Sequence, residues 1–409
     1  MQRQEENETK QVNVPEEIIV RILSRLSAIK SLLRFWCICK PWGALISNQD
    51  FIKMHLKRSS EDQNPSLIVY REPHCYSIDF DAFDLRKNMV RLDFAFLEEL
   101  STRFSIQSSC NGVLCLANSD TVFLWNPSTR KHKKLPPQCQ FPGVIGISVW
   151  TLGYSPRTEE YKVLRFIYIR DESNESLIVG WEVMVHTVGT DSWRNLGQIP
   201  WNLSDEMPWE TRVNGTPYWI AFRWPEPRDL IVSFDVGDEE FREIPIPNTS
   251  SEEEFRIVLK DVGVVRGRLF YIERLPDNFI EVWVMEDCEI KDSWVKLFRT
   301  KFDVDLRCFK PFFFSKDGEI VLLEEDSKKF ILCDPKRNVV REIRAFPEAE
   351  DGIAGLQYDR EVTKKRSGRI VCHFASVYLL QFLNHPILNG LYFIQDDAGV
   401  VSGNDANGV

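Results

Sequence analysis

A glycine that recurs at a nearly constant interval restricts what this chain can fold into more than any other feature. Four segments share a glycine, one further residue and then an apolar run, and their glycines are Gly112, Gly215, Gly267 and Gly318. Two of the intervals are about 51 residues and the first is about twice as long, so another copy is expected near residue 163. The segment 161–166 lies there and is rich in β-forming residues, although it has no glycine.

Each copy also holds two later apolar strands. The first of these ends in a turn, at 123–127, 232–235, 282–286 and 331–335. The next lies at 133–136, 242–245, 293–297 and 341–343, and 192–196 supplies it to the copy without a glycine. Runs of Val, Ile, Phe, Tyr and Trp that end at Gly, Pro, Asn or Asp are typical of short β-strands. The repeated unit is therefore strand, strand, turn, strand.

A repeat of about 50 residues with roughly four strands matches the kelch-type blade of a β-propeller, in which each blade packs against its neighbours. We predict an all-β, kelch-like propeller with six or seven blades. The pieces near 67–80 and 370–394 are expected to share one closing blade. A β-sandwich or a solenoid is the structural alternative.

The first sixty residues have a pattern typical of short helices. Pro15 is expected at the first helical position, and Glu16 and Glu17 suit the positive end of the helix dipole. Apolar residues then follow at helical spacing. A second apolar helix is expected to end at Pro41, because proline lacks the amide hydrogen that a helix interior needs. Asn48 is expected to cap a last short helix, which gives three or four helices in all.

The chain is thus predicted to be an α+β multidomain protein. We expect a disordered N-terminus at 1–12, a small all-α module at 13–58, the β-propeller at 66–397 and a disordered tail at 398–409. A module of about sixty residues buries only a marginal core. Its apolar surface is therefore covered either by a partner or by the rest of its own chain.

The run from Val14 to Phe51 resembles the F-box, whose usual pattern is Leu-Pro, an acidic residue, Ile-x-x-Ile-Leu-x-Arg-Leu-Pro, then Lys-Ser-Leu-x-Arg-Phe and Cys-Lys-x-Trp. The matching residues are Pro15, Ile18, Ile22, Leu23, Arg25, Leu26, Lys30, Ser31, Leu32, Arg34, Phe35, Cys39, Lys40 and Trp42. The chain departs from the pattern at Val14, at Ser27 and by one extra residue before Lys30.

In the F-box family this motif binds a Skp-type adaptor, which links the protein to a cullin–RING ubiquitin ligase. The resemblance therefore implies that these helices bind such an adaptor. The candidate residues for the interface or its support are Pro15, Ile18, Ile22, Leu23, Leu26, Leu32, Phe35 and Trp42.

The β-region carries a second resemblance, to the F-box-associated domain of the large plant F-box family. The residues that carry it lie at 109–116, 124–130, 152–154 and 161–163. The two resemblances together extend over nearly the whole chain, from Val14 to about Ile394. In that family the C-terminal domain captures the protein to be ubiquitinated. Within it, Asn126-Pro127 is interpreted as a strand-ending turn and not as a contact site.

The composition excludes several other classes of protein. The net charge is −10, which disfavours nucleic acid as a partner because phosphate binding needs concentrated positive charge. The sequence has no uninterrupted apolar run of about 20 residues, so it predicts no membrane span. The polar start MQRQEENETK does not resemble a secretion signal. Ten cysteines without a dense pairing pattern are expected to be reduced thiols. We therefore expect the cytoplasm, the nucleus or both.

No arrangement of residues predicts catalysis, a cofactor or a metal site. No two of the six histidines have the i, i+4 spacing of a helical metal site, and no Cys-x-x-Cys occurs. Packing is expected to account for Cys37 and Cys39, and the adjacent Cys372 and His373 would face opposite sides of a strand. No glycine-rich phosphate loop lies between a strand and a helix. The sequence predicts a protein that is not an enzyme.

The charged runs each have two interpretations. The acidic runs 238–240, 252–254 and 324–326 either bind a cation or a basic partner or form solvated loops between strands, which we favour. The basic runs 131–134 and 364–366 either act as a nuclear localisation signal or protect the exposed edge of a sheet.

Tryptophan is unusually frequent, with twelve in the chain. Those at repeat positions are explained by packing between blades, and they are Trp125, Trp219, Trp283 and Trp294. Trp201, Trp209 and Trp224 lie among prolines and out of phase with the strands. Large rigid side chains of this kind dominate many binding interfaces. Residues 200–228 are therefore predicted to contribute to the surface that binds a target protein.

These features predict the substrate-recognition subunit of an SCF-type (Skp-cullin-F-box) ubiquitin ligase. The F-box would bind a Skp-type adaptor, and the β-domain would bind a target protein that the sequence does not identify. The alternative is a stand-alone β-propeller that binds a protein or a carbohydrate and whose N-terminal helices do not engage a ligase.

Overall fold

The computed structural model describes the chain in segments. These are residues 14–26, 29–48, 50–55, 66–71, 74–79, 89–92, 104–118, 121–127, 129–137, 148–170, 178–203, 211–223, 228–247, 259–265, 267–275, 279–287, 293–301, 309–314, 320–324, 329–337, 339–344 and 377–380.

Short helices form the N-terminal module. They are α1 (Glu16–Leu23), α2 (Ile29–Trp36) and α3 (Lys40–Ile46), followed by helical residues 50–55. The backbone of Pro15 is not helical (φ −54°, ψ 140°), so Pro15 precedes the first helical residue, one position earlier than predicted. Glu16 and Glu17 lie in the first turn as expected. The Asn48 side chain accepts a hydrogen bond from the Asp50 amide at 2.8 Å, which confirms the predicted cap.

Pro41 begins a helix and does not end one. α2 stops at Trp36, and the extended residue Cys39 (φ −155°, ψ 157°) precedes α3. Pro41 then lies in the first turn of α3, where its missing amide hydrogen would have no acceptor within the helix. The prediction that Pro41 terminates the second helix is therefore wrong, because proline fits the start of a helix as well as it breaks the interior.

The helices pack around one small core. It is formed by Leu23, Leu32, Ile46 and Phe51, which are almost fully buried. His55 completes it: its ring stacks on Phe51, and its Nε2 lies 2.9 Å from the Leu26 carbonyl oxygen. Two of these core residues, Leu23 and Leu32, also match the F-box pattern.

The chain from residue 66 onward forms antiparallel sheets, which are numbered I to VI here. Sheet I contains β1 (Ser66–Arg71), β2 (His74–Asp79), β3 (Met89–Leu92) and β25 (Val377–Leu380). Sheet II contains β4 (Ser105–Cys110), β5 (Val113–Ala117), β6 (Val122–Asn126) and β7 (Lys131–Lys134). Sheet III contains β8 (Ser148–Ser155), β9 (Glu160–Arg170), β10 (Ile178–Thr187) and β11 (Arg194–Ile199).

The remaining sheets have the same antiparallel order. Sheet IV contains β12 (Asn202–Leu203), β13 (Thr211–Val213), β14 (Thr216–Arg223), β15 (Arg228–Asp235) and β16 (Glu240–Ile244). Sheet V contains β17 (Leu259–Val265), β18 (Arg268–Arg274), β19 (Phe279–Met285) and β20 (Trp294–Lys301). Sheet VI contains β21 (Phe309–Phe314), β22 (Ile320–Glu324), β23 (Lys329–Asp334) and β24 (Val339–Arg344).

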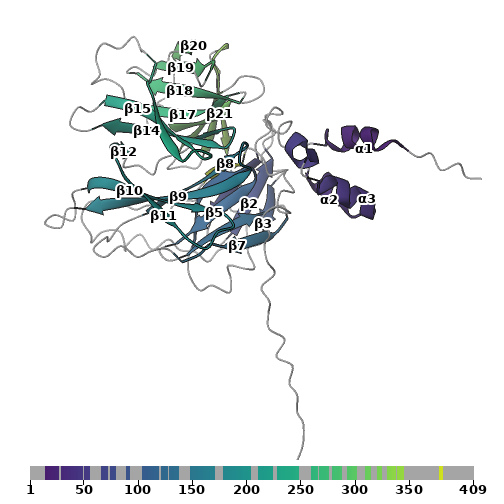
Figure 1. Ribbon diagram of the computed structural model, residues 1–409. Coiled ribbons are helices and arrows are strands. Elements are labelled where there is room, and N and C mark those ends of the chain that lie inside the picture. Colours follow the sequence, from purple (N-terminus) through teal and green to yellow (C-terminus); the bar gives the residue numbers. More distant parts are fainter. Residues whose placement is uncertain are drawn as a thin grey trace, which may run out of the picture.

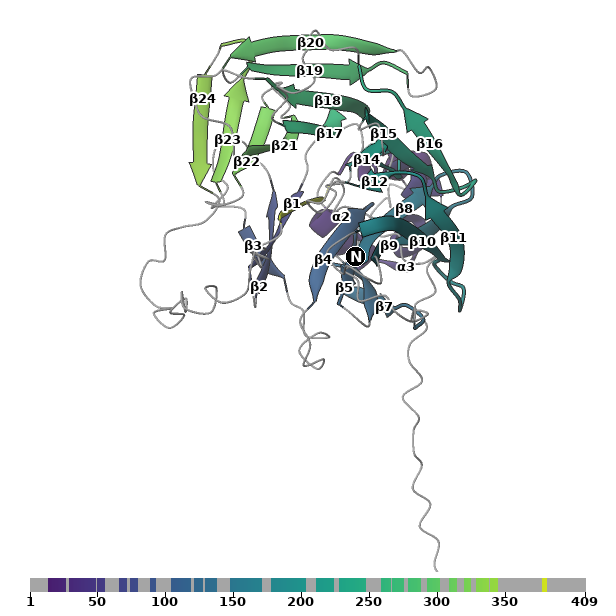
Figure 2. The ribbon, with the colours of Figure 1, turned by 90° about the vertical axis from the view of Figure 1, so that its left-hand side faces the viewer.

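The sheets follow one another around a ring, as Figures 1 and 2 show. Strands of successive sheets are in contact: β4 with β8, β8 with β14, β13 with β17, and β17 with β21. β25, the last described strand, completes sheet I by pairing with β1, and it also contacts β4 of sheet II. The predicted closing blade is therefore present in sheet I. The described residues hold six sheets in a propeller arrangement, and the number of blades in the whole chain stays a prediction.

The recurring glycines lie where the first two strands of a sheet join. Gly112, Gly215 and Gly267 have φ of 77°, 86° and 70°, a left-handed conformation that glycine adopts without strain. Gly318 lies outside the described residues. In sheet III a longer turn, residues 156–159, replaces the glycine turn, and Glu159 has φ of 59°. β9 confirms the strand predicted near residue 163.

The strand-ending turns are held by short polar side chains. Asn126 accepts a hydrogen bond from the Thr129 amide at 3.0 Å, Asp235 from the Gly237 amide at 2.9 Å, and Asp334 accepts similar bonds. Such side chains stabilise a turn by satisfying its free amides. Asn126-Pro127 is thus a structural turn, as predicted.

Large apolar side chains fill the spaces between sheets. Sheets II and III share a core that includes Leu124, Leu152 and Trp193. Sheets III and IV share another core, around Phe166 and Trp219. A third core lies between sheets IV and V. Of the tryptophans at repeat positions, Trp125 and Trp219 are almost fully buried, while Trp283 and Trp294 are partly buried and pack against the third core, which agrees with a packing role.

Candidate interaction surfaces

The helical module exposes a row of apolar side chains although its core is already filled. Val14, Ile18 and Ile22 lie four residues apart, so they share one face of the chain entering α1 and of α1 itself, and Ile22 is 56% exposed. Trp36 and Ile38, at the end of α2, are also exposed, Ile38 to 60%. A side chain of Ser47 accepts a hydrogen bond from the Trp36 indole at 3.0 Å and orients the ring. We call these five residues the apolar surface of the module.

The residues predicted to bind an adaptor divide into two groups. Pro15, Ile18 and Ile22 face outward. Leu23 and Leu32 are buried in the module core, and Leu26, Phe35 and Trp42 are partly buried against it. Sequence reasoning missed Val14, Trp36 and Ile38. The four-residue spacing of Val14, Ile18 and Ile22 is a signal that could have identified the outward face of α1.

The cysteines of the module do not have the role that the sequence suggests. Cys37 and Cys39 are exposed free thiols in the connection between α2 and α3, so packing does not account for them. They lie beside Trp36 and Ile38 in the chain, at the rim of the apolar surface.

An ion pair joins the helical module to sheet III. Lys53, in the last helical residues of the module, pairs with Glu159 in the turn between β8 and β9. The hydrogen bond from Lys53 to Glu159 raises the pKa of the Lys53 ammonium. In the same turn Arg157 pairs with Asp238 of sheet IV, so the contact of the module falls where two sheets meet.

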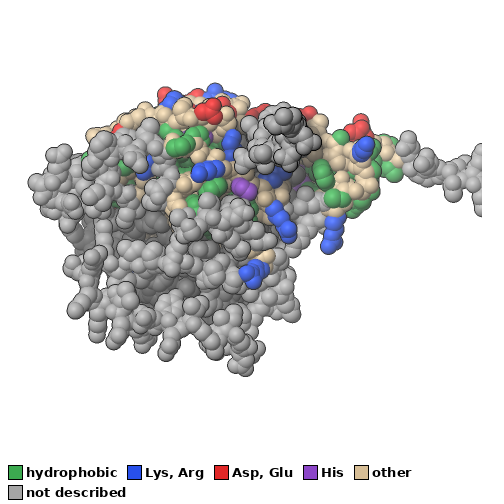
Figure 3. All heavy atoms as spheres, turned by 90° about the horizontal axis from the view of Figure 1, so that it is seen from below, with side chains coloured by type: hydrophobic (Ala, Val, Ile, Leu, Met, Phe, Trp, Pro, Cys, Tyr) green, Lys and Arg blue, Asp and Glu red, His purple; other side chains and the backbone are tan. Residues whose placement is uncertain are grey.

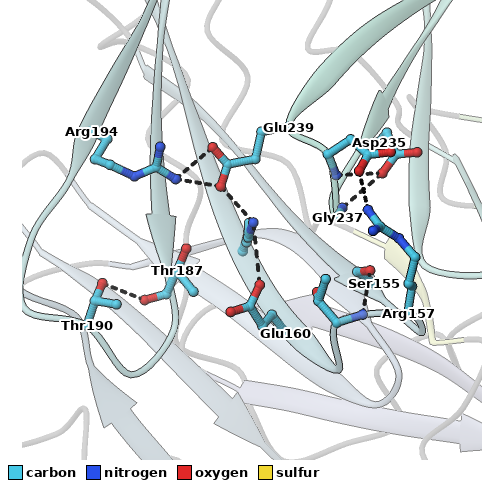
Figure 4. A network of polar contacts seen from close by, with 12 residues as sticks. Ser155, Arg157, Glu160, Thr187, Thr190, Arg194, Asp235, Gly237 and Glu239 are labelled. Atoms are coloured by element: carbon cyan, nitrogen blue, oxygen red, sulfur yellow. Dashed lines mark hydrogen bonds and ion pairs between the residues drawn. The ribbon is translucent and has the colours of Figure 1, made fainter.

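Glu239 is the centre of a polar network between sheets III and IV (Figure 4). Its carboxylate accepts a hydrogen bond from Lys162 at 2.6 Å and another from Arg194 at 2.6 Å. Burial alone would raise the pKa of Glu239, but these two cations outweigh it and hold the pKa below its ordinary value. The acidic run 238–240 is therefore only partly the solvated loop that we expected, because Glu239 is paired.

The tryptophans predicted to bind a target are placed only in part. Trp201 is 7% exposed, packs on Phe241 and donates a hydrogen bond to Glu243 at 2.6 Å. It belongs to the core between sheets III and IV, and packing explains it. The expectation that Trp201 is a surface anchor is corrected accordingly. Trp209 and Trp224 lie outside the described residues.

Two further features of the described segments bear on function. No group of three or more His, Cys, Asp or Glu in them could hold a metal ion. Among the same residues, no helix is long and apolar enough to cross a membrane. Cys372, His373 and the basic run 364–366 lie outside them.

Comparisons with known proteins agree with both halves of this architecture. The family described as "F-box domain" matches residues 12–54, and the family described as "F-box associated beta propeller domain" matches residues 66–378. The chain is 28% identical to F-box protein CPR1 of Arabidopsis thaliana, over 78% of this chain and 82% of that protein. It is 30% identical to F-box protein At3g07870 of the same plant, over 69% of this chain and 72% of the relative.

Among solved structures, TolB from Acinetobacter baumannii aligns with 74% of this chain and 69% of its own, at 13% identity and a TM-score of 0.39. The second of the two family matches covers most of the chain and coincides with the ring of sheets, and the first coincides with the helical module. The chain therefore belongs to the F-box proteins, and its β-domain is an F-box-associated β-propeller.

Proposed function

We propose that this protein is the substrate-recognition subunit of an SCF-type ubiquitin ligase. Its F-box binds a Skp-type adaptor, and its propeller binds a target protein. The protein performs no covalent step. It acts by effective concentration, because a target held near the ubiquitin-carrying enzyme meets it far more often than in free solution.

The apolar surface of the F-box supports the adaptor half of this proposal. A small soluble domain seldom exposes so many large apolar side chains unless a partner covers them. The core of Leu23, Leu32, Ile46 and Phe51 is complete without Ile18, Ile22 or Ile38. Those side chains are therefore available to an adaptor without unfolding the helices that present them.

The target half of the proposal rests on the direction of the strands. The F-box contact at Glu159 lies at the end of sheet III where the Tyr154 amide donates a hydrogen bond to the Gly215 carbonyl at 3.1 Å. β14 begins at Thr216, next to Gly215, and runs away from this F-box contact to Arg223. Near the far end of β14, Phe222 pairs with Asn202. Trp224 follows directly. We propose that Trp209 and Trp224 contribute to a target-binding surface on the side of the propeller away from the F-box, with Trp201 supporting it from the core.

The compartment follows from the same proposal. Cys37, Cys39, Cys110, Cys115 and Cys333 form no disulfide, and the last three are buried in the sheets. Buried cysteines without disulfides suit a reducing environment. We propose that the protein works in the cytoplasm, the nucleus or both.

Binding of a purified Skp-type adaptor, measured by calorimetry, tests the adaptor half. The test variant is Ile18→Glu with Ile22→Glu, which places two charges in the proposed interface. A control variant, Val295→Glu with Leu297→Glu, changes two equally exposed apolar residues on β20 of the propeller. Burying an unpaired charge in an apolar interface is strongly unfavourable, so the first variant should bind about 100-fold more weakly or not at all. The control should bind like the unmodified protein.

Two results would contradict the adaptor proposal. One is absence of binding by the unmodified protein, which would favour a stand-alone propeller whose helices do not engage a ligase. The other is an equal loss in both variants. Leu23 and Leu32 are unsuitable for this experiment, because a charge at either buried position would unfold the F-box and remove binding for a trivial reason.

A second experiment tests the target half. The variant Trp209→Ala with Trp224→Ala should keep its thermal stability and its affinity for the adaptor, while losing co-purified proteins that the unmodified chain retains, as quantified by mass spectrometry. Trp201→Ala should instead lower the thermal stability, since it removes a buried side chain. A collapse of stability in the Trp209 and Trp224 variant would place those side chains in the core and end the proposal for them.

A further inference from the structure

One outer strand of the propeller carries positive charge that its surroundings do not balance. We propose that β7 is a docking edge for an extended acidic segment of a partner protein. The strand and the residue before it contain Arg130, Lys131, Lys133 and Lys134, with His132 between them. All of these side chains are exposed except that of Lys133, which is partly so. This inference does not depend on the ligase assignment.

The outer strands of sheets III, IV and V have charges that are paired within the propeller. On β11, Arg194 pairs with Glu239, and on β16, Arg242 pairs with Asp235 at 2.9 Å. On β20, Lys296 and Arg299 form ion pairs with Glu281 of the neighbouring β19, at 3.0 Å and 3.2 Å. The cations of these outer strands are thus largely neutralised from within the propeller.

The cations of β7 have no such partners among the described residues. Within that part of the chain, no acidic side chain pairs with Arg130, Lys131, Lys133 or Lys134. Lysines on an outer strand often serve only to prevent edge-to-edge pairing. The outer strands of sheets III, IV and V carry charges that are balanced within the propeller, whereas β7 carries a run of unbalanced cations in a chain of net charge −10, which calls for an anionic partner.

The position of β7 also suits an extended peptide. In the described part of the chain β7 pairs only with β6, and the Leu135 amide just beyond it donates to the Val122 carbonyl at 2.9 Å. By the alternation of an antiparallel ladder, backbone groups at every second residue of β7, Lys134 among them, point away from β6. A peptide that adds as a further strand would use these groups for hydrogen bonds.

The charges lie on both faces of the strand. The register pairs Lys133 with Leu124, which faces sheet III, and Lys134 with Phe123, which faces the other way. Lys131 shares the face of Lys133. A partner strand lying along this edge would therefore meet cations at successive positions, and a run of three or more consecutive acidic residues fits it best. Figure 3 shows one face of the molecule with its Lys and Arg side chains.

A peptide is favoured over nucleic acid by the same observations. The cations lie along one strand only, while the protein as a whole is acidic and would repel a long polyanion. An extended acidic peptide needs contact with a single edge. Its backbone can also pair with the strand, which a phosphate backbone cannot do in this geometry.

Fluorescence anisotropy with the full-length protein at physiological salt tests the proposal. The probe is the labelled octapeptide Thr-Val-Glu-Glu-Glu-Glu-Val-Thr, with a Gln version and a version N-methylated at every Glu amide as comparison peptides. The first variant is Lys131→Glu, Lys133→Glu and Lys134→Glu, and the second replaces the same residues with Gln. The control variant, Arg268→Glu with Lys336→Glu, changes two exposed cations on other sheets.

We expect the acidic peptide to bind the unmodified protein and the Gln and N-methylated peptides to bind at least tenfold more weakly. The Glu variant should lose roughly tenfold in affinity, the Gln variant somewhat less, and the control less than twofold. Thermal unfolding of each variant checks that it is folded. The proposal is overturned if the acidic peptide does not bind, if it binds the Glu variant equally well, or if the N-methylated peptide binds as tightly as its parent. Tighter binding of an eight-nucleotide oligo-dT would assign the edge to nucleic acid instead.

Discussion

Gly197 and Gly215 have nearly the same backbone conformation in very different surroundings. Their φ values are 87° and 86°, which strain any residue with a Cβ atom. A Cβ at Gly197 would meet nothing within 4 Å. A Cβ at Gly215 would collide with the backbone of Tyr154, whose amide is hydrogen-bonded to the Gly215 carbonyl. The pair therefore separates the cost of the conformation from the cost of pushing two sheets apart.

We predict that Gly197→Ala lowers the free energy of unfolding by about 1 kcal/mol, the cost of the left-handed conformation alone. Gly215→Ala should cost roughly 3 kcal/mol or more, because sheets III and IV must separate to admit the methyl group. Urea unfolding followed by tryptophan fluorescence measures both. An equal decrease in the free energy of unfolding of both variants would mean that sheets III and IV can separate enough to admit the methyl group at little cost.

The second prediction at the scale of single residues concerns acid. The pKa of Glu239 is held below its ordinary value of 4.5 by Arg194 and Lys162, in spite of burial. A carboxyl with a lowered pKa in the folded state stabilises the fold above its ordinary pKa and stops doing so as the pH falls through the lowered value. Glu239→Gln should therefore be less stable than the unmodified protein at pH 7, and the difference should shrink steadily below about pH 4.5.

Thermal unfolding between pH 7 and pH 3 checks this prediction for Glu239. Glu240→Gln is the matched control, because Glu240 is the exposed neighbour on β16 and forms no ion pair within the described part of the chain. Its stability should follow that of the unmodified protein across the range. A stability difference for Glu239→Gln that stays constant down to pH 3 would show that the carboxylate charge contributes nothing.

At the scale of elements, a repeated tryptophan ties the outer strands of neighbouring sheets together. The Trp193 indole, just before β11, donates to the Pro136 carbonyl, which follows β7, at 3.0 Å. The Trp294 indole at the start of β20 donates to the Pro245 carbonyl, which follows β16, at 2.9 Å. Both tryptophans follow an Asp-Ser pair in the sequence. The same contact thus links sheet III to sheet II and sheet V to sheet IV.

Replacing each tryptophan with Phe should loosen one junction at a time, because the ring stays while its donor is lost. In Trp193→Phe, hydrogen exchange measured by mass spectrometry should speed up in β7 and β11 only, and in Trp294→Phe it should speed up in β16 and β20 only. Trp219→Phe is the control, since the buried Trp219 indole has no hydrogen-bond acceptor to lose. Identical exchange patterns in all three variants would contradict the idea that these tryptophan hydrogen bonds join the outer strands.

The sequence predicts a structural feature well when that feature is determined by residues adjacent in the chain, and poorly when it is determined by distant residues. The turns at Gly112, Gly267 and Asn126 depend on a few adjacent residues, so their spacing predicted the strands correctly. Trp201 was misplaced because its burial depends on Phe241, which is far along the chain. The contact of Lys53 with Glu159, 106 residues apart, left no mark in the sequence of either segment.

The F-box illustrates the same limit within a single helix. Ile22 and Leu23 are adjacent, are both apolar and both match the family pattern, yet one is 56% exposed and the other is buried. Which of them faces outward is decided by the packing of α2 and α3 against α1, and a periodic pattern alone cannot supply that. The structure therefore separates the exposed apolar residues of the module from the buried residues that support them, where the sequence listed them together.

At the scale of the whole molecule, the ring depends on its last described strand. β25 supplies one edge of sheet I, pairing from Val69–Val377 to Ser66–Leu380. We predict that a chain ending at residue 376 has a lower thermal unfolding midpoint and self-associates, because the backbone edge of β1 is left unpaired. A chain ending at 397 should behave like the full chain. Calorimetry and sedimentation velocity measure both properties, and a monomeric, equally stable 376-residue chain would contradict closure by β25.

This closure has a consequence for how the protein is made. The F-box precedes the propeller in the chain and has a core of its own, whereas sheet I stays incomplete until β25 has been translated. A message with a premature stop codon before position 377 would thus yield a product that has the F-box but no complete sheet I. Under the function proposed above, such a product would occupy the adaptor without holding a target, and would therefore act as a dominant inhibitor of intact copies.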